Sequence, residues 1–226
     1  MAKTRKPVAL IVGVGPGLGA AVARRFAGEG MDVAMAARQG DKLASLAKET
    51  GGRAYGCDAT VETAVDDLFA AVERGLGRPD LVVFNASGYS RKPVTELSVG
   101  EVEAAWRTSC LGGFLVGRAA ARAMLPAGSG TILLTGATAS LRGSAQFAAF
   151  AMGKFGLRAL AQSMARELGP QGIHVAHIVI DGGIGESAEA NRLAPSAIAE
   201  AYWQLHRQAK SAWTQELDLR PWAEKF

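Results

Sequence analysis

Short apolar runs alternate with longer amphipathic stretches along the chain. The first run, Val8–Val12, is unbroken, as expected for a strand buried on both faces of a sheet. Such alternation predicts parallel strands joined by helices. The predicted strands are Val8–Val12, Asp32–Ala37, Arg53–Cys57, Asp80–Phe84, Thr131–Thr135, Ile173–Ile180 and a last one near Ala212–Leu219. The predicted helices are Gly17–Gly30, Asp41–Thr50, Val61–Leu76, about Ser98–Leu125, about Gln146–Leu168 and about Pro195–Gln208.

This order of elements predicts an α/β fold with a single domain over residues 1–226. We expect a Rossmann-type, doubly wound parallel sheet of about seven strands with helices on both faces. No internal repeat, low-complexity tract or linker interrupts the sequence. Residues 1–6 are expected to form a flexible tail, and residues 185–226 a substrate loop and a C-terminal segment. Ligands in such folds bind at the carboxyl ends of the strands.

Composition and charge narrow the range of partners. The chain has 226 residues, of which 49% are hydrophobic and 20% charged, a profile of folded globular proteins. The formal net charge is +4, and three of the basic residues (Lys3, Arg5 and Lys6) lie in the predicted tail. A body with so little excess charge and no basic stripe argues against nucleic acid as a partner.

The cysteine content argues against a disulfide-stabilised or metal-binding protein, and the first apolar stretch argues against a membrane segment. Cys57 and Cys110 are the two cysteines, and they provide neither a disulfide framework nor a metal-ligand spacing, so we expect buried thiols, no metal and a cytoplasmic protein. The sequence MAKTRK followed by the uncharged stretch Pro7–Ala23 resembles a signal peptide or a short membrane span. Four glycines and a proline interrupt that stretch, so no membrane segment is predicted.

A glycine-rich turn, VGVGPGLG over residues 12–19, directly follows the first predicted strand. Such a turn brings the backbone close to a pyrophosphate, which the N-terminus of the next helix stabilises. The glycines fit two registers. Residues 15–20 match the dinucleotide fingerprint G-x-G-x-x-A, whereas Gly13, Gly17 and Gly19 fit another spacing, which we prefer because Gly13 abuts the strand. A dinucleotide site is predicted, with a purely structural turn as the alternative.

The end of the second predicted strand bears on the choice of dinucleotide. A carboxylate there favours NAD, but this chain has Ala36, Ala37 and Arg38. A guanidinium can stack on adenine and pair with the 2′-phosphate of NADP. The sequence therefore favours NADP(H) over NAD(H). The alternative is that Arg38 is an ordinary solvated charge in a loop.

Together these motifs resemble the short-chain dehydrogenase/reductase family over about residues 7–184. The spacing of Gly13, Gly17 and Gly19 is similar to the family's T-G-x-x-x-G-x-G loop, with Val12 in place of Thr. Cys57-Asp58-Ala59 resembles its C-D-V stretch, whose Asp bonds the adenine amine, and Asn85-Ala86-Ser87-Gly88 resembles its N-N-A-G, which lies along the cofactor. Residues 130–175 resemble the family's fifth strand, active-site loop, catalytic helix and sixth strand.

The resemblance implies an NAD(P)-dependent oxidoreductase that acts on a small organic molecule. It also implies a homodimer or homotetramer formed through the two long helices. The implied cofactor-binding residues are Gly13, Gly15, Pro16, Gly17, Leu18, Gly19, Arg38, Asp58, Ala59, Asn85, Ala86, Ser87, Gly88, Lys154 and Ile184.

The chain departs from the family at the catalytic positions. Of the family's Asn, Ser, Tyr and Lys, only Lys154 matches. Phe150 holds the position of the Tyr, Ala137 that of the Ser, and Ser109 aligns with the Asn. In the family the Lys lowers the pKa of the Tyr and holds the nicotinamide ribose, the Tyr transfers the proton, and the Ser orients the carbonyl. Phe150 and Ala137 have no such group, so only the ribose role of Lys154 is expected to remain.

The remaining polar residues near the predicted site single out no proton donor. The family's Pro-Gly after the sixth strand is replaced by the sequence IDGGI over residues 180–184. Polar side chains expected on segments near the site are Thr138, Ser140, Ser144, Gln146, Tyr89 and Asp181, while His174 and His177 are expected in the core or at the surface. We expect a substrate pocket formed by Tyr89, Leu141–Phe147 and the segment after Ile184, with Phe147, Tyr202 and Trp203 as its aromatic residues.

Three functions stay open at this point. The first, which we favour, is an NADPH-preferring oxidoreductase with a non-standard proton donor. The second is an NADP-binding pseudoenzyme that acts as a sensor or partner subunit. The third is a binding protein that has also lost the nucleotide, and the intact glycine-rich loop argues against it.

Overall fold

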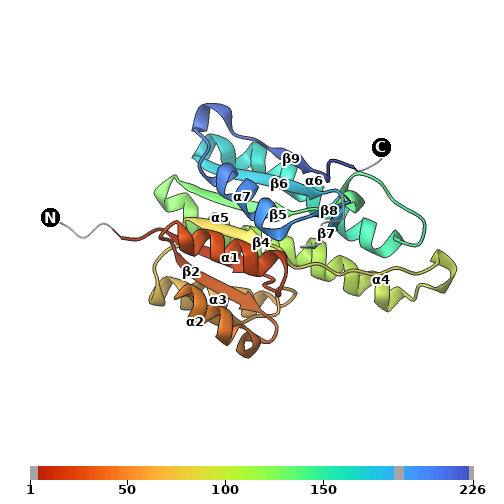
Figure 1. The fold of residues 1–226 in the computed structure, drawn as a ribbon, viewed down its shortest axis with the longest axis horizontal. Helices are drawn as coiled ribbons and strands as arrows, with labels where there is room; N and C mark the ends of the chain where they lie inside the picture. Colours follow the sequence, from red (N-terminus) through yellow and green to blue (C-terminus); the bar gives the residue numbers. More distant parts are fainter. Residues whose placement is uncertain (1–4, 186–190, 224–226) are drawn as a thin grey trace.

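A computed structural model describes residues 5–185 and 191–223 of the chain. Its main sheet has seven parallel strands in the order β3-β2-β1-β4-β5-β6-β9 (Figure 1). The strands are β1 (Val8–Val12), β2 (Asp32–Ala37), β3 (Arg53–Gly56), β4 (Leu81–Phe84), β5 (Gly130–Thr135), β6 (Ile173–Ile180) and β9 (Glu216–Leu219). The predicted Rossmann-type doubly wound sheet is confirmed.

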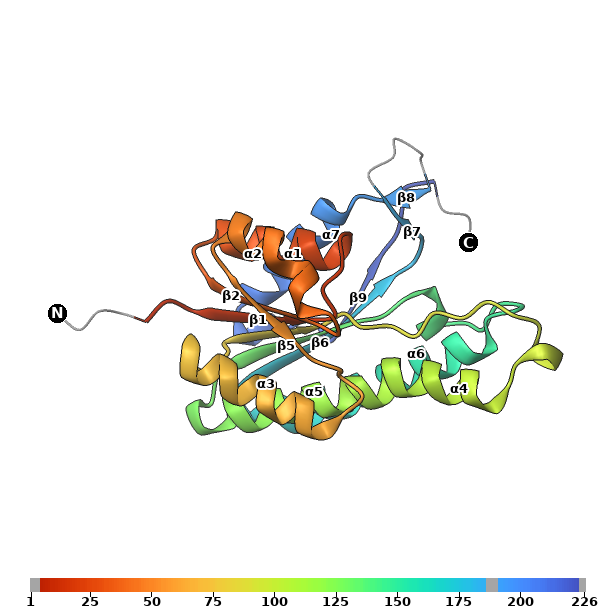
Figure 2. The same cartoon turned by 90° about the horizontal axis from the view of Figure 1, so that it is seen from below.

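Helices cover both faces of this sheet (Figure 2). One face carries α1 (Leu18–Gly28), α2 (Ala44–Thr50) and α7 (Pro195–His206), and the other carries α3 (Glu62–Gly75), α4 (Val99–Trp106), α5 (Gly112–Met124) and α6 (Ala148–Leu168). Two apolar cores fill the spaces between sheet and helices. Strand β1 supplies Leu10 to one core and Ile11 to the other, which is why its sequence is apolar without a break.

The strand order reverses beside β1. From there the chain proceeds to β2 and β3 on one side and to β4, β5, β6 and β9 on the other. The ends of the two central strands lie next to each other, with Val12 paired to Phe84. The loops after these strands therefore diverge from a common point, where open α/β sheets bind their ligands.

The long helix predicted over Ser98–Leu125 is interrupted. Helix α4 begins as expected, because the Ser98 hydroxyl caps it and Glu101 completes a capping box. A π-helical turn, Arg107–Leu111, then separates α4 from α5. Such turns occur most often near functional sites, and this one contains the buried Ser109. The backbone is helical from Val99 to Met124, so the predicted long helix is present, with a π-helical turn in its middle that was not predicted.

Two further segments differ from expectation. A short parallel ladder joins β7 (Gly183–Ile184) to β8 (Arg192–Leu193), and strands of two residues are too short to show a periodicity. The last strand begins at Glu216 and not near Ala212, because Lys210–Ala212 forms a 3-10 turn. Residues 186–190 of the predicted substrate loop and residues 224–226 lie outside the described residues.

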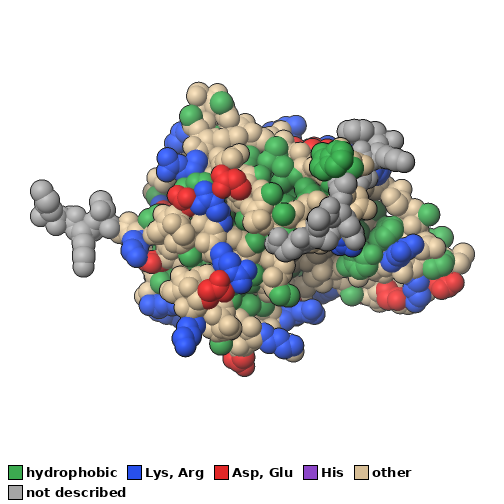
Figure 3. Space-filling view, in the orientation of Figure 1, with side chains coloured by type: hydrophobic (Ala, Val, Ile, Leu, Met, Phe, Trp, Pro, Cys, Tyr) green, Lys and Arg blue, Asp and Glu red, His purple; other side chains and the backbone are tan. Residues whose placement is uncertain are grey.

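The distribution of charged side chains on the surface agrees with the small net charge of the sequence. On the face shown in Figure 3, basic and acidic side chains are interspersed. In the predicted tail, residues 1–4 are outside the described residues. Arg5 Nη2 donates to both carboxylate oxygens of Asp80, at 2.8 and 2.9 Å. Among residues 5–185 and 191–223, no helix combines the length and apolar character needed to cross a membrane.

Candidate active site

The glycine-rich loop lines a cavity of 1110 Å³ at the ends of β1 and β4. Gly13 has a φ of +89°, and a Cβ atom there would lie 2.3 Å from the backbone nitrogen of Ala86. Only glycine fits this close approach of the two loops. This observation agrees with the register in which Gly13 opens the motif.

Asn85 holds the two loops together. Its side-chain amide Nδ2 donates to the carbonyl oxygen of Gly13 at 3.0 Å, and its backbone N–H donates to the carbonyl oxygen of Val12 at 2.8 Å. The loop after β4 therefore fixes the conformation of the loop after β1. Asn85, Ala86 and Ser87 all line the cavity.

The far end of this cavity contains basic side chains beside one carboxylate. Arg38 follows β2, and Lys42 lies in the next turn. Asp58 accepts hydrogen bonds from the backbone N–H and the hydroxyl of Thr60 at 2.9 and 2.8 Å. These hydrogen bonds, helped by the charge of Arg38, hold the pKa of Asp58 below its ordinary value. The positively charged residue Lys42 was not predicted, since no motif marks it.

Most of the predicted cofactor residues line one of two adjoining cavities. The first cavity contains Gly13, Gly15, Pro16, Arg38, Asp58, Ala59, Asn85, Ala86 and Ser87. The second contains Leu18, Lys154 and Ile184 and shares Asn85 and Ser87 with the first.

Gly17, Gly19 and Gly88 line neither cavity. A Cβ at Gly19 would lie 2.8 Å from the Cα of Val14, and one at Gly88 would lie 2.6 Å from the Cα of Ala105. These two glycines permit close packing of the loops against α1 and α4. Gly17 is the N-cap of α1.

Lys154 is buried at the base of the second cavity, which measures 730 Å³. Its side chain comes from α6, is 2% exposed, and donates from Nζ to the carbonyl oxygen of Thr135 at 2.7 Å. Burial lowers the pKa of this ammonium from 10.5 to about 8. The remaining N–H groups of Lys154 suit hydroxyl oxygens such as those of a ribose.

Two aromatic rings, Phe147 and Phe150, form a wall of the second cavity, and Phe150 holds the position expected for the family's tyrosine. The ring centroid of Phe150 lies 5.9 Å from Lys154 Nζ and 6.5 Å from the ring of Phe147. Ala137 lines the same cavity. Phe150, Ala137 and Lys154 therefore line one cavity, and the side chains of Phe150 and Ala137 can neither donate nor accept a proton.

Ser109 serves a structural contact. It is fully buried in the π-helical turn and lines neither cavity. Its Oγ accepts a hydrogen bond from the backbone N–H of Gly88 at 3.0 Å. This hydrogen bond fixes the loop that carries Asn85, and Ser109 itself does not face either cavity.

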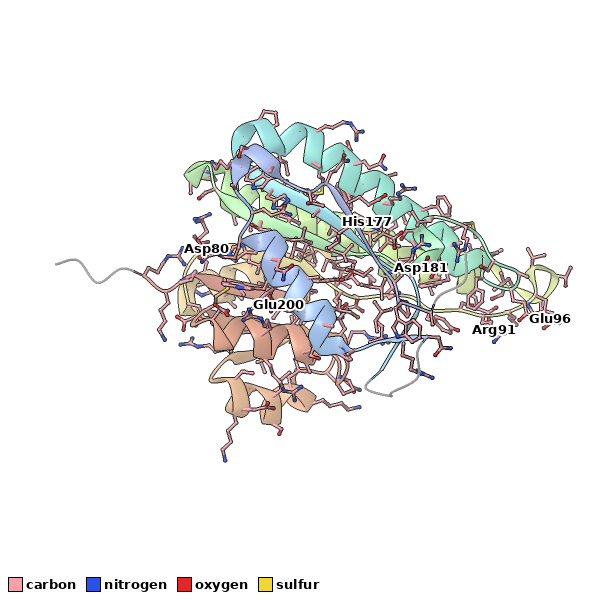
Figure 4. The ribbon with its side chains drawn as sticks, turned by 45° about the horizontal axis from the view of Figure 1, so that its top comes forward. Asp80, Arg91, Glu96, His177, Asp181 and Glu200 are labelled. Carbon is pink, nitrogen blue, oxygen red and sulfur yellow. The ribbon has the colours of Figure 1, made fainter. Side chains whose placement is uncertain are left out.

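A buried carboxylate at the end of β6 engages a neighbouring hydroxyl. Asp181 is 1% exposed, and its Oδ1 accepts a hydrogen bond from Thr138 Oγ1 at 2.5 Å. Arg142 Nη2 lies 3.6 Å from Oδ1, and Arg220 Nε lies 3.3 Å from Oδ2. This cluster links the loop after β5, the end of β6 and the C-terminal segment. Figure 4 labels Asp181 and His177, which both come from this end of the sheet. The sequence did not predict these ion pairs because their partners are far apart along the chain.

Two other predicted polar residues are also engaged. Ser140 is fully buried, and its Oγ accepts from the backbone N–H of Ala137 at 3.2 Å. Gln146 accepts from Arg91 Nε at 3.1 Å, and Arg91 extends away from the sheet in Figure 4. Neither residue lines the second cavity.

The two histidines of β6, expected in the core or at the surface, are both buried. His174 stacks on Trp213 at 4.9 Å between centroids. His177 Nδ1 lies 3.0 Å from Glu216 Oε2, and burial lowers the pKa of this imidazole to about 4. His177 is therefore neutral near pH 7, and it does not line the second cavity.

The expected aromatic lining of the substrate pocket was partly wrong. Phe147 and Tyr89 do line the second cavity. Tyr202 is fully buried and bonds to Thr135 Oγ1 at 2.8 Å, while Trp203 packs against Phe26 of α1. Helix α7 turns both rings toward α1 and the sheet, a direction that the sequence pattern of one helix could not specify.

Comparison with known proteins relates this chain to the short-chain dehydrogenases. The sequence model of the short chain dehydrogenases matches residues 7–197. D-threitol dehydrogenase of Mycolicibacterium smegmatis is 31% identical over 174 residues, which are 74% of this chain and 66% of that protein. Sorbitol-6-phosphate 2-dehydrogenase of Escherichia coli is 31% identical over 196 residues, which are 83% and 75% of the two chains.

Solved structures are similar over almost the whole chain. A short-chain dehydrogenase from Rhodopseudomonas palustris is 43% identical with a TM-score of 0.88 over 96% of this chain and 100% of that one. A metagenomic short-chain oxidoreductase in complex with NADP is 29% identical with a TM-score of 0.85 over 97% and 99%. The chain therefore belongs to the short-chain dehydrogenase/reductase family of oxidoreductases.

Proposed function

We propose that this protein is an NADPH-preferring oxidoreductase of small organic substrates whose proton donor is a group other than residue 150. The observation that carries the proposal is the pair of adjoining cavities, which share Asn85 and Ser87. One contains the glycine-rich loop and Arg38, and the other contains Lys154 within an aromatic wall. The residues fit a dinucleotide, because the approach at Gly13 leaves no room for a side chain and Arg38 can pair with a phosphate. The metagenomic relative that binds NADP supports the same assignment.

The chain's own residues have distinct tasks in this proposal. A bound NADP(H) supplies or accepts the hydride. Lys154 binds ribose hydroxyls through N–H groups that Thr135 leaves available. Phe147 and Phe150 give the second cavity an apolar wall, which suits an organic substrate.

Oxidation of NADPH with three probes tests the proposal. Acetophenone, dihydroisoquinoline and cyclohexenone represent ketones, imines and enones, and we expect steady turnover with at least one of them. Calorimetry on the same preparation measures NADPH binding independently. Tight NADPH binding without oxidation in any of the three reactions would contradict the proposal and support the pseudoenzyme.

Arg38→Ala is expected to weaken the binding of NADP⁺ and leave that of NAD⁺ nearly unchanged. Hydrogen bonds to charged groups contribute about 1.5–3 kcal/mol, so the dissociation constant for NADP⁺ should rise about 10- to 100-fold. Titration calorimetry with both dinucleotides measures the effect. Arg166→Ala removes an exposed arginine on α6, outside both cavities, and serves as the control. An equal loss of affinity for both dinucleotides would show that Arg38 does not recognise the 2′-phosphate.

We also propose that the protein forms a homodimer or homotetramer through α4 and α6. Large apolar side chains are exposed on this side of the molecule, among them Trp106, Met152 and Phe155. Such a group of exposed apolar residues is typical of a protein interface.

Phe155→Arg is expected to convert the native oligomer to a monomer. A buried charge without a partner opposes association, and light scattering measures the mass. Val61→Arg places the same charge at an exposed apolar residue before α3 and should leave the mass unchanged. A monomeric native protein, or an oligomer that survives Phe155→Arg, would contradict this interface.

A further inference from the structure

Five side chains with a hydroxyl group line the second cavity, and two of them, Thr135 and Thr138, are hydrogen-bonded within the protein. Thr135 Oγ1 is bonded to the hydroxyl of the buried Tyr202, and the hydroxyl proton of Thr138 points to Asp181. Both hydroxyls are thus engaged within the protein, and both belong to aliphatic alcohols, which are weak acids.

The remaining side chains of this cavity with a hydroxyl or an amino group are Ser87, Tyr89, Ser144 and Lys154. Lys154 is the group that the proposed function assigns to the ribose. Ser144 and Ser87 carry aliphatic alcohols, which are much weaker acids than a phenol. Tyr89 therefore has the side chain best suited to give a proton.

Tyr89 lies against the ring that stands in place of the missing tyrosine. It comes from the loop between β4 and α4, and its ring centroid is 5.4 Å from that of Phe150 and 5.9 Å from that of Phe147. Of the three tyrosines in the sequence, Tyr55 and Tyr202 line neither cavity. The phenol is thus adjacent to position 150 but belongs to a different segment of the chain.

We propose that Tyr89 is the catalytic proton donor of this protein. The proposal rests on the proposed function. As a hydride from NADPH reaches the carbonyl carbon of a substrate, the π electron pair of the C=O bond moves to oxygen, and that oxygen takes the proton of Tyr89 Oη. The products are an alcohol, NADP⁺ and the Tyr89 phenolate. The side chain is 67% exposed, so water restores the proton directly and no buried relay is needed.

Tyr89→Phe tests this role while keeping the ring and its packing on Phe150. We expect kcat for the best of the three probes to fall about 10²–10⁴-fold. KM should change by less than about threefold, because the lost interaction belongs to the transition state. Tyr55→Phe removes a hydroxyl outside both cavities and should leave kcat unchanged.

A second substitution distinguishes lost chemistry from disturbed structure. Adding Phe150→Tyr to Tyr89→Phe returns a phenol to the same cavity, and kcat should recover by about tenfold or more. Turnover that survives Tyr89→Phe would overturn the role of Tyr89 and leave the proposed function intact. A native protein that oxidises no NADPH would overturn both.

Nitration provides a readout that does not depend on turnover. Tyr89 is exposed, whereas Tyr202 is fully buried, so tetranitromethane should modify Tyr89 first, as mass spectrometry of peptides can measure. NADP⁺ together with acetophenone should protect Tyr89 and leave the rate at Tyr55 unchanged. Equal nitration of Tyr89 with and without these two compounds would overturn the proposal.

Discussion

Lys154→Met is expected to abolish a rise in stability with pH that native Lys154 causes between about pH 8 and 10.5. In this window the folded protein holds Lys154 neutral while the unfolded chain still binds the proton, so raising the pH favours the folded state. Below pH 8 the ammonium is charged in both states, and its burial destabilises the fold. Each pKa unit corresponds to about 1.4 kcal/mol, so the full change is on the order of 3 kcal/mol.

Urea unfolding of the native protein and of Lys154→Met, at several pH values from 7 to 10.5, measures this effect. The difference in free energy of unfolding between the two proteins cancels most other titrating groups, including the Cys57 thiol, whose pKa burial raises to about 11. Lys48→Met, at an exposed lysine of α2, should show no such change with pH. A constant difference between native protein and Lys154→Met would contradict the buried ammonium.

Gly13→Ala is expected to lower the free energy of unfolding by about 2–5 kcal/mol and to impair NADPH binding. The φ of +89° disfavours any residue with a Cβ, and the added atom would lie 2.3 Å from the Ala86 nitrogen. Relief of this clash requires the loops after β1 and β4 to separate. Because both loops line the first cavity, the loss of stability and the loss of binding have one cause.

Gly15→Ala is the matched control for stability. Gly15 lies in the same loop, has no positive φ, and a Cβ there would meet no atom within 4 Å. Its free energy of unfolding should stay within about 1 kcal/mol of the native value. Equal stability of Gly13→Ala and Gly15→Ala in urea unfolding would show that the approach of Gly13 to Ala86 is not required by the fold.

The sequence predicted the sheet well because burial on both faces produces strong local patterns. The bounds of β1, β2 and β6 agree with the predicted strands. The π-helical turn between α4 and α5 was missed, since it changes the backbone bonding and leaves the chain helical.

The site was predictable where a short motif defines it. The positions of Gly13, Lys154 and Phe150 followed from spacing and resemblance, and the structure brings them to two adjoining cavities. The orientation of Tyr202 and the ion pairs of Asp181 depend on contacts between distant segments. Such contacts form only when the strands are assembled. No periodicity in the sequence therefore reveals them.

The central claim is that this chain transfers a hydride from NADPH although position 150 has no phenol. Incubating the native protein with NADPH that carries deuterium at both C4 positions of the nicotinamide and with each of the three probes, followed by mass spectrometry of the product, tests the claim most directly. We expect one deuterium at the reduced carbon of at least one product, and no labelled product in a parallel reaction without protein. NADPH that binds but transfers no deuterium to any probe would contradict the account.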